Sequence, residues 1–512
     1  MRTNSLLINL IITAAIISLS LSCTSDPAEK APNIIYILAD DMGYGDVSAM
    51  NPEAAWETQH IDRIAREGIR FTDAHSGSAV CTPTRYGVLT GRYSWRTRLK
   101  KGVLWSWDKP LIGPGETTVG TLLQEQGYNT ACVGKWHLGL GWQYHETYPD
   151  SVDFSLAVTD GPITLGFDYF FGITASLDIP PYVYVENDLS TMVPIKYTRN
   201  SSEYSWWRTG LTSDDFVHEE VLPLLTKKAV DFIDKHQASQ ANEPFFLYFP
   251  LPAPHTPILP TDEFQGKSGT NPYGDFVLQV DYTVGQILKS LEAHGIAENT
   301  LLIFTSDNGC SPEANFPELS GHGHNPSYHF RGHKADIFEG GHRVPFIARW
   351  PDKIKPGTVN PQVICLTDLL ATVAEITEAS LDPGAGVDSY SLLPALLSNS
   401  EMTIREATVH HSVNGSFAIR KGPWKLIFSP GSGGWSEPRP GSPSVDKLPP
   451  YQLYNLETDI GETNNLMELY PEVVEELTAL LKQYIEKGRS TPGPKQDNDP
   501  SEKWPGLSWM TD

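Results

Sequence analysis

Short apolar runs and longer amphipathic stretches alternate along the first 350 residues of the chain. The apolar runs predict strands that are buried on both faces, as in a parallel sheet. These predicted strands are 34–39, 245–249 and 301–305, and 129–133 is predicted as a short strand that follows a helix. Helical spacing that ends at or near a glycine predicts helices at 58–68, 117–127 and 276–294. Strands that alternate with helices indicate an α/β fold, with a large, mixed but mostly parallel sheet flanked by helices.

The pattern changes after about residue 400. Four short stretches there favour antiparallel strands, namely 407–411, 417–420, 424–428 and 452–455. A Gly-, Pro- and Ser-rich insertion at 429–450 separates the last two, and residues 471–487 have the spacing of an amphipathic helix. We therefore predict a smaller C-terminal α+β domain. Residues 140–225 are rich in aromatic and loop residues and give no clear pattern.

The first residues have the pattern of an export signal. Arg2 precedes an apolar run at 6–21, which is short for a membrane span and typical of a signal-peptide core. Cys23 follows this run and resembles the lipidation site of bacterial lipoproteins, although Ser20 stands where a larger aliphatic residue is usual. Ordinary cleavage near the same place is the alternative. We expect an exported protein: a periplasmic or outer-membrane-anchored lipoprotein of a bacterium, or a secreted protein.

These patterns together predict five segments. They are a leader at 1–23, a tether at 24–32, a catalytic domain at 33–400, a C-terminal α+β subdomain at 401–490 and a Pro-rich tail at 491–512.

Composition and charge exclude some classes of protein and of partner. The chain has 512 residues, of which 40% are hydrophobic, so it can build a large core and is not disordered. It carries 38 basic and 62 acidic residues, a formal net charge of −24, which argues against a nucleic-acid partner. Five cysteines are too few for a disulfide scaffold.

Acidic and amide side chains follow two of the predicted strands. Asp40 and Asp41 come directly after the first, and Asp307 and Asn308 come after 301–305. Ligands bind outside the carboxyl ends of parallel strands, so the two pairs can meet at one point. Such an oxygen-only set suits Ca²⁺ or Mg²⁺. Turn and cap chemistry explains the same residue types, and these pairs alone do not decide between the two interpretations.

A longer motif favours a functional site over turn and cap chemistry. The segment Cys81–Arg85 reads Cys-x-Pro-x-Arg, and residues 89–92 read Leu-Thr-Gly-Arg. This motif resembles the signature of the type I sulfatases, which belong to the alkaline phosphatase superfamily. The resemblance implies that a formylglycine-generating maturation enzyme oxidises Cys81 to an aldehyde, which is hydrated to a geminal diol.

The resemblance continues along the chain in the order of the family. The further matching segments are 32–46, 134–139, 254–257, 305–309 and 333–341. Ala335 departs from the pattern, because glycine is common at that position in the family. The resemblance covers about residues 32 to 350 and implies an alkaline-phosphatase-like fold.

The resemblance also implies a role for each motif residue. The implied metal ligands are Asp40, Asp41, Asp307, Asn308 and the group derived from Cys81, with Ca²⁺ favoured over Mg²⁺. The implied catalytic residues are Cys81, Arg85, Lys135, His137, His255 and Lys334. Arg85 would orient the diol, and Lys135 and Lys334 would hold sulfate oxygens. His255 would protonate the departing alcohol, His137 would take a proton from the remaining hydroxyl, and Asp307 is the candidate base for the attacking hydroxyl.

The substrate is less well defined by sequence. We expect a sulfated carbohydrate of glycosaminoglycan or marine-polysaccharide type, attacked at a terminal sugar. The residues expected at the mouth of the pocket are Trp105, His322, His324, Arg331 and His333; packing, plain surface and a second metal site are the alternatives. Two rival functions stay open: a phosphonate or phosphate ester hydrolase, and a non-catalytic glycan-binding lipoprotein. The oligomeric state is not indicated.

Overall fold

The computed structural model of the chain describes residues 30–147, 151–397, 403–500 and 504–510. Residues 32–512 form one compact unit. The predicted leader, with Cys23, lies outside the described residues, as does most of the tether. In the described part of the chain, no helix has both the length and the apolar character needed to span a membrane.

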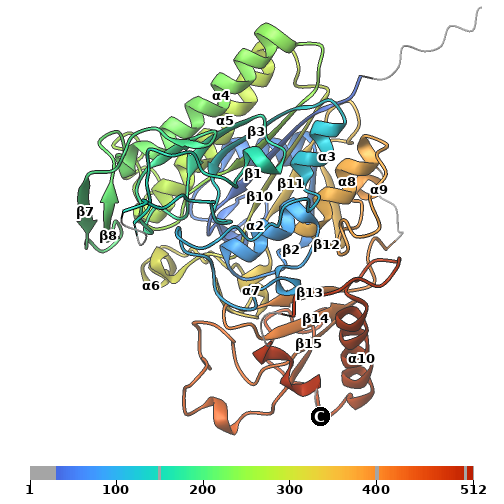
Figure 1. The fold of residues 1–512 in the computed structure, drawn as a ribbon. Helices are drawn as coiled ribbons and strands as arrows, with labels where there is room; N and C mark the ends of the chain where they lie inside the picture. Colours follow the sequence, from blue (N-terminus) through green and yellow to red (C-terminus); the bar gives the residue numbers. More distant parts are fainter. Residues whose placement is uncertain (1–29, 148–150, 398–402, 501–503, 511–512) are drawn as a thin grey trace, which may run out of the picture. The chain divides into compact units, whose positions relative to one another are not determined.

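A ten-stranded mixed sheet forms the centre of the fold (Figure 1). Its strand order is β12-β2-β11-β10-β1-β9-β3-β4-β5-β6. The bounds are β1 Asn33–Ala39, β2 Ile69–His75, β3 Asn129–Lys135, β4 Tyr169–Ile173, β5 Tyr184–Glu186, β6 Leu189–Ser190, β9 Phe245–Pro250, β10 Thr300–Ser306, β11 Phe346–Arg349 and β12 Thr358–Cys365. The four strands predicted in this part of the chain are β1, β3, β9 and β10, and they lie side by side and parallel at the centre.

Alternate side chains of β1 point into two apolar layers. Ile34 and Tyr36 pack into the layer on one face, and Ile35 and Ile37 pack into the layer on the other. Helices α2 (Cys81–Thr90), α3 (Val119–Glu125) and α8 (Leu369–Ile376) cover the first face. Helices α1 (Gln59–Glu67), α4 (Val221–Gln240) and α5 (Pro272–Ala293) cover the second. This arrangement confirms the predicted α/β fold.

Helix α5 begins four residues before the predicted start at Phe276. The side chain of Asn271 accepts hydrogen bonds from the backbone N–H groups of Tyr273 and Gly274, and Pro272 is the first helical residue. Both features favour a helix start, because Asn caps free N–H groups and Pro has none to satisfy. The apolar pattern alone misses this first turn, because Pro272 and Gly274 are poor helix formers in sequence.

The C-terminal part is a four-stranded antiparallel sheet with a long helix, as predicted. The strands are β13 Thr408–His411, β14 Phe417–Lys421, β15 Trp424–Ile427 and β16 Gln452–Asn455, in that order in the sheet. Helix α10 (Pro471–Lys487) packs against it (Figure 1). The segment without a predicted pattern contains β4 to β6 and a separate hairpin of β7 (Lys196–Asn200) and β8 (Trp207–Thr212). The domain division near residue 400 stays a prediction.

A buried cluster of charged groups and histidines joins the C-terminal sheet to the main sheet. This junction cluster consists of Asp73, His75, Glu339, His342, Arg343, His410, Arg420, Lys425 and Glu462. Its three carboxylates balance its three side-chain cations. The rings of His342 and His410 stack at 3.9 Å with an interplanar angle of 7°, and ring nitrogens of these two residues and of His75 lie within 4.8 Å of one another. Lys425 Nζ lies 3.0 Å from Nε2 of His342. In the structure these groups form a buried network of hydrogen bonds and ion pairs.

Candidate active site

The predicted metal ligands meet at the carboxyl ends of β1 and β10. The two strands pair in parallel with Ala39 opposite Ser306, so Asp40 and Asp307 both leave the sheet at the same edge. The backbone N–H of Asp41 donates to Oδ1 of Asp307 at 3.2 Å, and Asn308 Nδ2 donates to Oδ1 of Asp41 at 2.8 Å. Each of the four side chains is almost completely buried. The structure therefore brings together the two oxygen-bearing pairs that the sequence separates by more than 260 residues.

Cys81 is the first residue of α2 and is buried beside these carboxylates. Its Sγ lies within 4.8 Å of ligand atoms of Asp40, Asp41 and His255. The free N–H groups at a helix start carry a partial positive charge, so this position favours an anion. The four groups form one compact, buried centre.

Three cations surround the centre. Arg85 lies four residues after Cys81 on α2 and donates to Oδ2 of Asp307 at 2.8 Å. Lys135 Nζ donates to Oδ2 of Asp40 at 2.7 Å, and Lys334 Nζ donates to Oδ2 of Asp41 at 2.6 Å. Arg85 also lies 3.4 Å from Oδ1 of Asp40, so each carboxylate of the centre has at least one cationic partner.

The carboxyl groups of Asp40 and Asp307, which follow β1 and β10, differ in pKa. Burial alone would raise the pKa of Asp40, but Lys135, His255 and Arg85 hold the pKa of that carboxyl well below its usual range. Burial, together with the neighbouring charge of Asp40, raises the pKa of Asp307 to about 7. A site this rich in buried carboxylates is therefore stabilised by any cation that joins it.

Two histidines face the centre in different states. Burial, with Lys135 and Arg85 nearby, holds the pKa of His137 well below its usual range, so the ring is neutral. His137 Nε2–H donates to the carbonyl of Leu104 at 2.8 Å, which leaves Nδ1 as a bare acceptor without a partner among the described residues. Burial and Lys334 lower the pKa of His255, but Asp41 and Asp40 outweigh them and the pKa is about 8. The first ring is suited to accept a proton and the second to donate one.

Three residues of the centre occupy the left-handed backbone region, which non-glycine residues seldom adopt. Their φ angles are 64° for Asp41, 55° for His137 and 77° for Ala335. Ala335 follows Lys334, so the glycine that is common there in the resembling family is explained by the backbone conformation. Such strain persists only where the surrounding structure enforces it, and it concentrates here beside the motif side chains.

The oxygens of the centre fit a hard divalent cation. Oδ1 of Asp40 and Oδ1 of Asn308 are buried and have no hydrogen-bond partner among the described residues. A buried oxygen without a hydrogen bond is unfavourable by about 1–3 kcal/mol. Within the described chain, Oδ1 of Asp40 has only a guanidinium nitrogen of Arg85 at 3.4 Å, so both oxygens favour a ligand. Carboxylate and amide oxygens are the donors that Ca²⁺ and Mg²⁺ take. Asp40, Asp41, Asp307 and Asn308 could hold such an ion.

The structure separates the residues predicted for the pocket mouth. Trp105 is 49% exposed and follows Leu104, the partner of His137. His333 is half-buried next to Lys334, and His322 is exposed.

Two of these predicted residues are engaged elsewhere. His324 is 1% exposed and lies against the ring of Trp56. Its Nε2 bonds Asp46 and its Nδ1 accepts from the backbone N–H of Ala55, so both ring nitrogens are engaged in the core and neither is free for a sugar. The Arg331 guanidinium packs on Phe338 at 3.8 Å and donates to the carbonyl of Glu462.

Two residues that sequence reasoning missed lie beside the centre. Asp178 Oδ1 lies 4.0 Å from Nδ1 of His255, and Asp178 Oδ2 accepts a hydrogen bond from Arg208. Both belong to the loop-rich stretch 140–225, where no spacing pattern marked them. Arg208 follows Trp206 and Trp207, whereas the residues next to Asp178 give no such signal.

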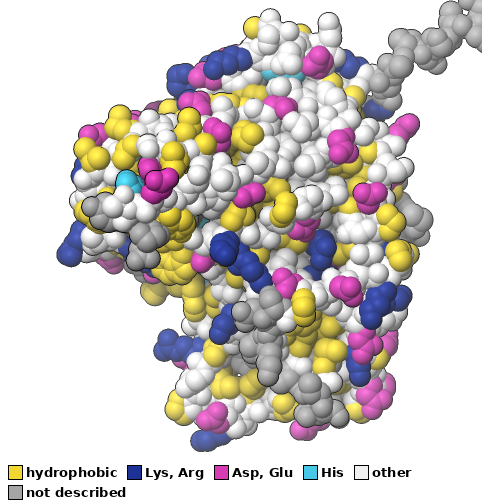
Figure 2. Space-filling model, in the orientation of Figure 1, with side chains coloured by type: hydrophobic (Ala, Val, Ile, Leu, Met, Phe, Trp, Pro, Cys, Tyr) yellow, Lys and Arg dark blue, Asp and Glu magenta, His cyan; other side chains and the backbone are white. Residues whose placement is uncertain are grey.

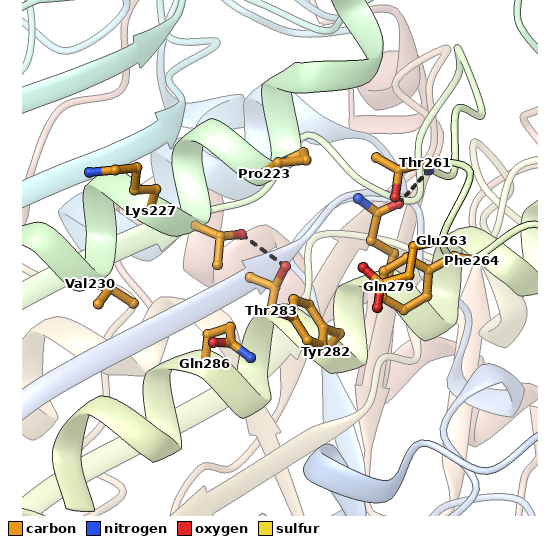
Figure 3. A pocket seen from close by; sticks show the side chains of 11 residues that line it. Pro223, Lys227, Val230, Thr261, Glu263, Phe264, Gln279, Tyr282, Thr283 and Gln286 are labelled. Atoms are coloured by element: carbon orange, nitrogen blue, oxygen red, sulfur yellow. Dashed lines mark hydrogen bonds between the residues drawn. The ribbon is translucent and has the colours of Figure 1, made fainter. Parts of the chain in front are cut away.

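Another cavity lies apart from this centre. It has a volume of about 390 Å³ and lies between α4 and α5, next to the loop that carries Phe264 (Figure 3). A hydrogen bond of 3.0 Å between Thr226 and Thr283 crosses it. None of the predicted site residues lines it. On the face shown in Figure 2, acidic, basic and apolar side chains are interspersed.

Comparisons with known proteins agree with this geometry. The family model described as Sulfatase matches residues 32–379. The N-acetylgalactosamine-6-O-sulfatase of Bacteroides thetaiotaomicron is 36% identical over 493 residues, covering 88% of this chain and 93% of the relative. Human arylsulfatase A is 31% identical over 477 residues, covering 89% and 87%. A solved structure described under the metabolism of multiple glycosaminoglycans by Bacteroides thetaiotaomicron has a TM-score of 0.77 and 34% identity, and covers 89% of this chain and 99% of that one.

Proposed function

Because the chain belongs to the sulfatase family and is a sulfuric ester hydrolase, we propose that it releases sulfate from sulfated carbohydrates through a formylglycine made from Cys81. The observation that carries this proposal is the position of Cys81. It begins α2 within 4.8 Å of two carboxylates and a histidine, in a centre that three cations surround. A surface or purely structural cysteine has no need of that surrounding.

The carbohydrate substrate is supported by the relatives. One of them is named for N-acetylgalactosamine 6-O-sulfate, and the solved structure is described under glycosaminoglycan metabolism. We propose the same class of substrate for this chain, with cleavage at a terminal sugar. The export pattern of residues 1–23 suits an enzyme that meets polysaccharide fragments outside the cytoplasm, and Cys23 would supply a lipid anchor.

The residues of the centre divide the first half of the reaction among them. One hydroxyl of the hydrated Cys81 aldehyde gives its proton to Asp307 and attacks the sulfur, and the bond from sulfur to the sugar oxygen breaks. His255 gives a proton to that oxygen, so the sugar leaves as an alcohol. Lys135 and Lys334 lie against carboxylates at 2.7 and 2.6 Å, from where they can hold sulfate oxygens as point charges. The product at Cys81 is a covalent sulfate ester.

The second half regenerates the aldehyde. His137 takes the proton of the remaining hydroxyl at its bare Nδ1, the bond from carbon to the sulfate oxygen breaks, and sulfate leaves. No water needs to attack sulfur in this step. Arg85 is held by Asp307 and by the carbonyl of Lys135, so it can orient the hydroxyls without moving. A Ca²⁺ held by Asp40, Asp41, Asp307 and Asn308 would supply positive charge to the sulfate oxygens.

The mass of the tryptic peptide Phe71–Arg85 tests the proposal directly. The chain is expressed with a maturation enzyme that converts a control sulfatase fully, and the peptide is then measured. We expect the mass of an aldehyde in place of the Cys81 thiol. An unmodified thiol, alongside full conversion of the control, would contradict the formylglycine mechanism.

Removal of the cation is expected to lower the thermal stability as well as the activity. A ligand that binds only the folded state adds about 2.7 kcal/mol at a hundredfold excess over its Kd. We therefore expect EDTA to lower the Tm and added Ca²⁺ to restore it, with a smaller effect of Mg²⁺. Asn308→Ala should lose this response, whereas Asn414→Ala, a loop residue outside the centre, should keep it. An EDTA effect of equal size in both variants would place the cation elsewhere.

A further inference from the structure

Asp178 lies beside the centre, and only one of its two carboxylate oxygens has a hydrogen-bond partner in the described part of the chain. Asp178 is 6% exposed, and its Oδ2 accepts a hydrogen bond from Arg208. Its Oδ1 is buried and has no hydrogen-bond partner among the described residues. Nδ1 of His255 lies 4.0 Å away but is already bonded to the carbonyl of Thr256 at 2.5 Å, so this ring does not satisfy it. A buried carboxylate oxygen that accepts nothing is unfavourable unless a ligand completes it.

The ring of His255 lies between Oδ1 of Asp178 and the centre. Nε2 of His255 lies 3.5 Å from Oδ2 of Asp41, on the side of Cys81, whereas Nδ1 faces Asp178. In the proposed reaction His255 protonates the sugar oxygen that leaves. The other hydroxyls of that same sugar lie only a few bonds from the leaving oxygen. The unsatisfied oxygen of Asp178 is therefore placed to meet one of them.

Arg208 and two tryptophans complete a wall next to Asp178. The guanidinium carbon of Arg208 lies 5.3 Å from the ring centre of Trp105 and 5.0 Å from that of Trp206. The backbone N–H of Arg208, on β8, also donates to the carbonyl of Asp178 at 3.3 Å. Trp105 leaves half of its surface open and follows Leu104, the hydrogen-bond partner of His137. Flat apolar faces next to a fixed acceptor suit a sugar ring, which has an apolar face and hydroxyls at its rim.

We infer that Asp178 is a specificity residue that accepts a hydrogen bond from a free hydroxyl of the sulfated sugar. This inference rests on the proposed function. A carboxylate accepts and does not donate, so the partner must carry an O–H or N–H group. The favoured substrate is the sulfate ester of a neutral pyranose, a hexose or an N-acetylhexosamine, with a free hydroxyl near the ester. A uronate carboxylate at this position would be repelled by Asp178.

The test compares substrates that differ by one hydroxyl. Wild type and Asp178→Ala are assayed with N-acetylgalactosamine 6-sulfate and with its 3-deoxy and 4-deoxy analogues. In wild type, one deoxy analogue should lower kcat/KM by about 10²-fold, as expected for a lost hydrogen bond to a charged group. Asp178→Ala should lose a similar factor on the complete sugar and should show no further loss with that analogue. Asp214→Ala, an exposed carboxylate paired with Lys196, serves as the control and should behave as wild type.

Three outcomes would overturn the inference. If Asp178 only positions His255, the deoxy analogue lowers kcat/KM equally in wild type and in Asp178→Ala. Equal wild-type rates on all three sugars would show that no hydroxyl is recognised. Hydrolysis of 4-nitrophenyl sulfate but of no neutral pyranose sulfate would exclude the substrate class. Failure of the proposed function gives a distinct result. Wild type with an unmodified Cys81 thiol would then hydrolyse neither the aryl sulfate nor the sugar sulfates.

Discussion

Replacing Cys81 with alanine is expected to lower kcat for sulfate esters by about 10⁴-fold or more. Alanine cannot become an aldehyde, so no hydroxyl is available to attack sulfur. The surrounding cations and carboxylates remain in place, because they pair with one another at 2.6 to 2.8 Å. Sulfate release from N-acetylgalactosamine 6-sulfate and from 4-nitrophenyl sulfate measures the effect. Binding of the sulfated sugar should survive.

Cys132→Ala is the matched control for this prediction. Cys132 is also a buried thiol, it lies on β3, and burial raises its pKa well above the usual value. This variant should keep the wild-type kcat. Turnover of sulfate esters by Cys81→Ala would contradict the proposed nucleophile. Faster wild-type turnover of phosphate esters than of sulfate esters would favour the phosphatase rival, and sugar binding without any turnover would favour the glycan-binding rival.

The largest effect on stability is expected at Lys425, in the junction cluster. Its Nζ lies 3.0 Å from Oε1 of Glu339 and 2.8 Å from Oε1 of Glu462, and the side chain is fully buried. Lys425→Met keeps the apolar stem but leaves two buried carboxylates without their shared cation. Breaking a buried pair in this way lowers the free energy of unfolding by about 3–5 kcal/mol. Urea unfolding of the whole chain measures the change.

Lys421→Met provides the comparison. Lys421 lies on the neighbouring strand and also bridges two carboxylates, Glu406 at 3.0 Å and Glu476 at 2.9 Å, but these groups are exposed to water. Exposed pairs contribute only about 0–1 kcal/mol, so this variant should unfold close to wild type. Equal losses in the two variants would show that the burial of the junction cluster does not matter.

The junction cluster also supports the active site. The backbone carbonyl of Ser76, between β2 and α2, accepts a hydrogen bond from His410 at 2.9 Å, and Ala79 N–H donates to the carbonyl of His411 at 3.0 Å. The start of the helix that carries Cys81 is therefore held by the C-terminal sheet. Lys425→Met should lower activity at temperatures below its Tm, since loosening this sheet also loosens the start of α2.

Much of the fold and most of the centre follow from local sequence. Apolar runs predicted β1, β9 and β10, because only a strand covered on both faces can bury such a run, and β3 was predicted as a short strand after a helix. The acidic and amide residues after β1 and β10 could be placed together, since parallel strands end at the same edge of a sheet. The motif from Cys81 to Arg85 spans one helical turn, so its geometry is local as well.

Tertiary structure decided the rest. Nothing in the sequence joins Asp178 to Arg208 or to His255, because these contacts form between loops and the strand β8, which lie far apart in the sequence. His324 is a second case. Its polar, histidine-rich sequence context predicted a position at the mouth of the pocket, but contacts with Asp46 and Trp56 hold it in the core. The junction cluster gathers residues from position 73 to position 462 through buried charge pairs. Periodicity reports which face of an element is buried, whereas the partner of a buried charge is known only when distant elements have packed against each other.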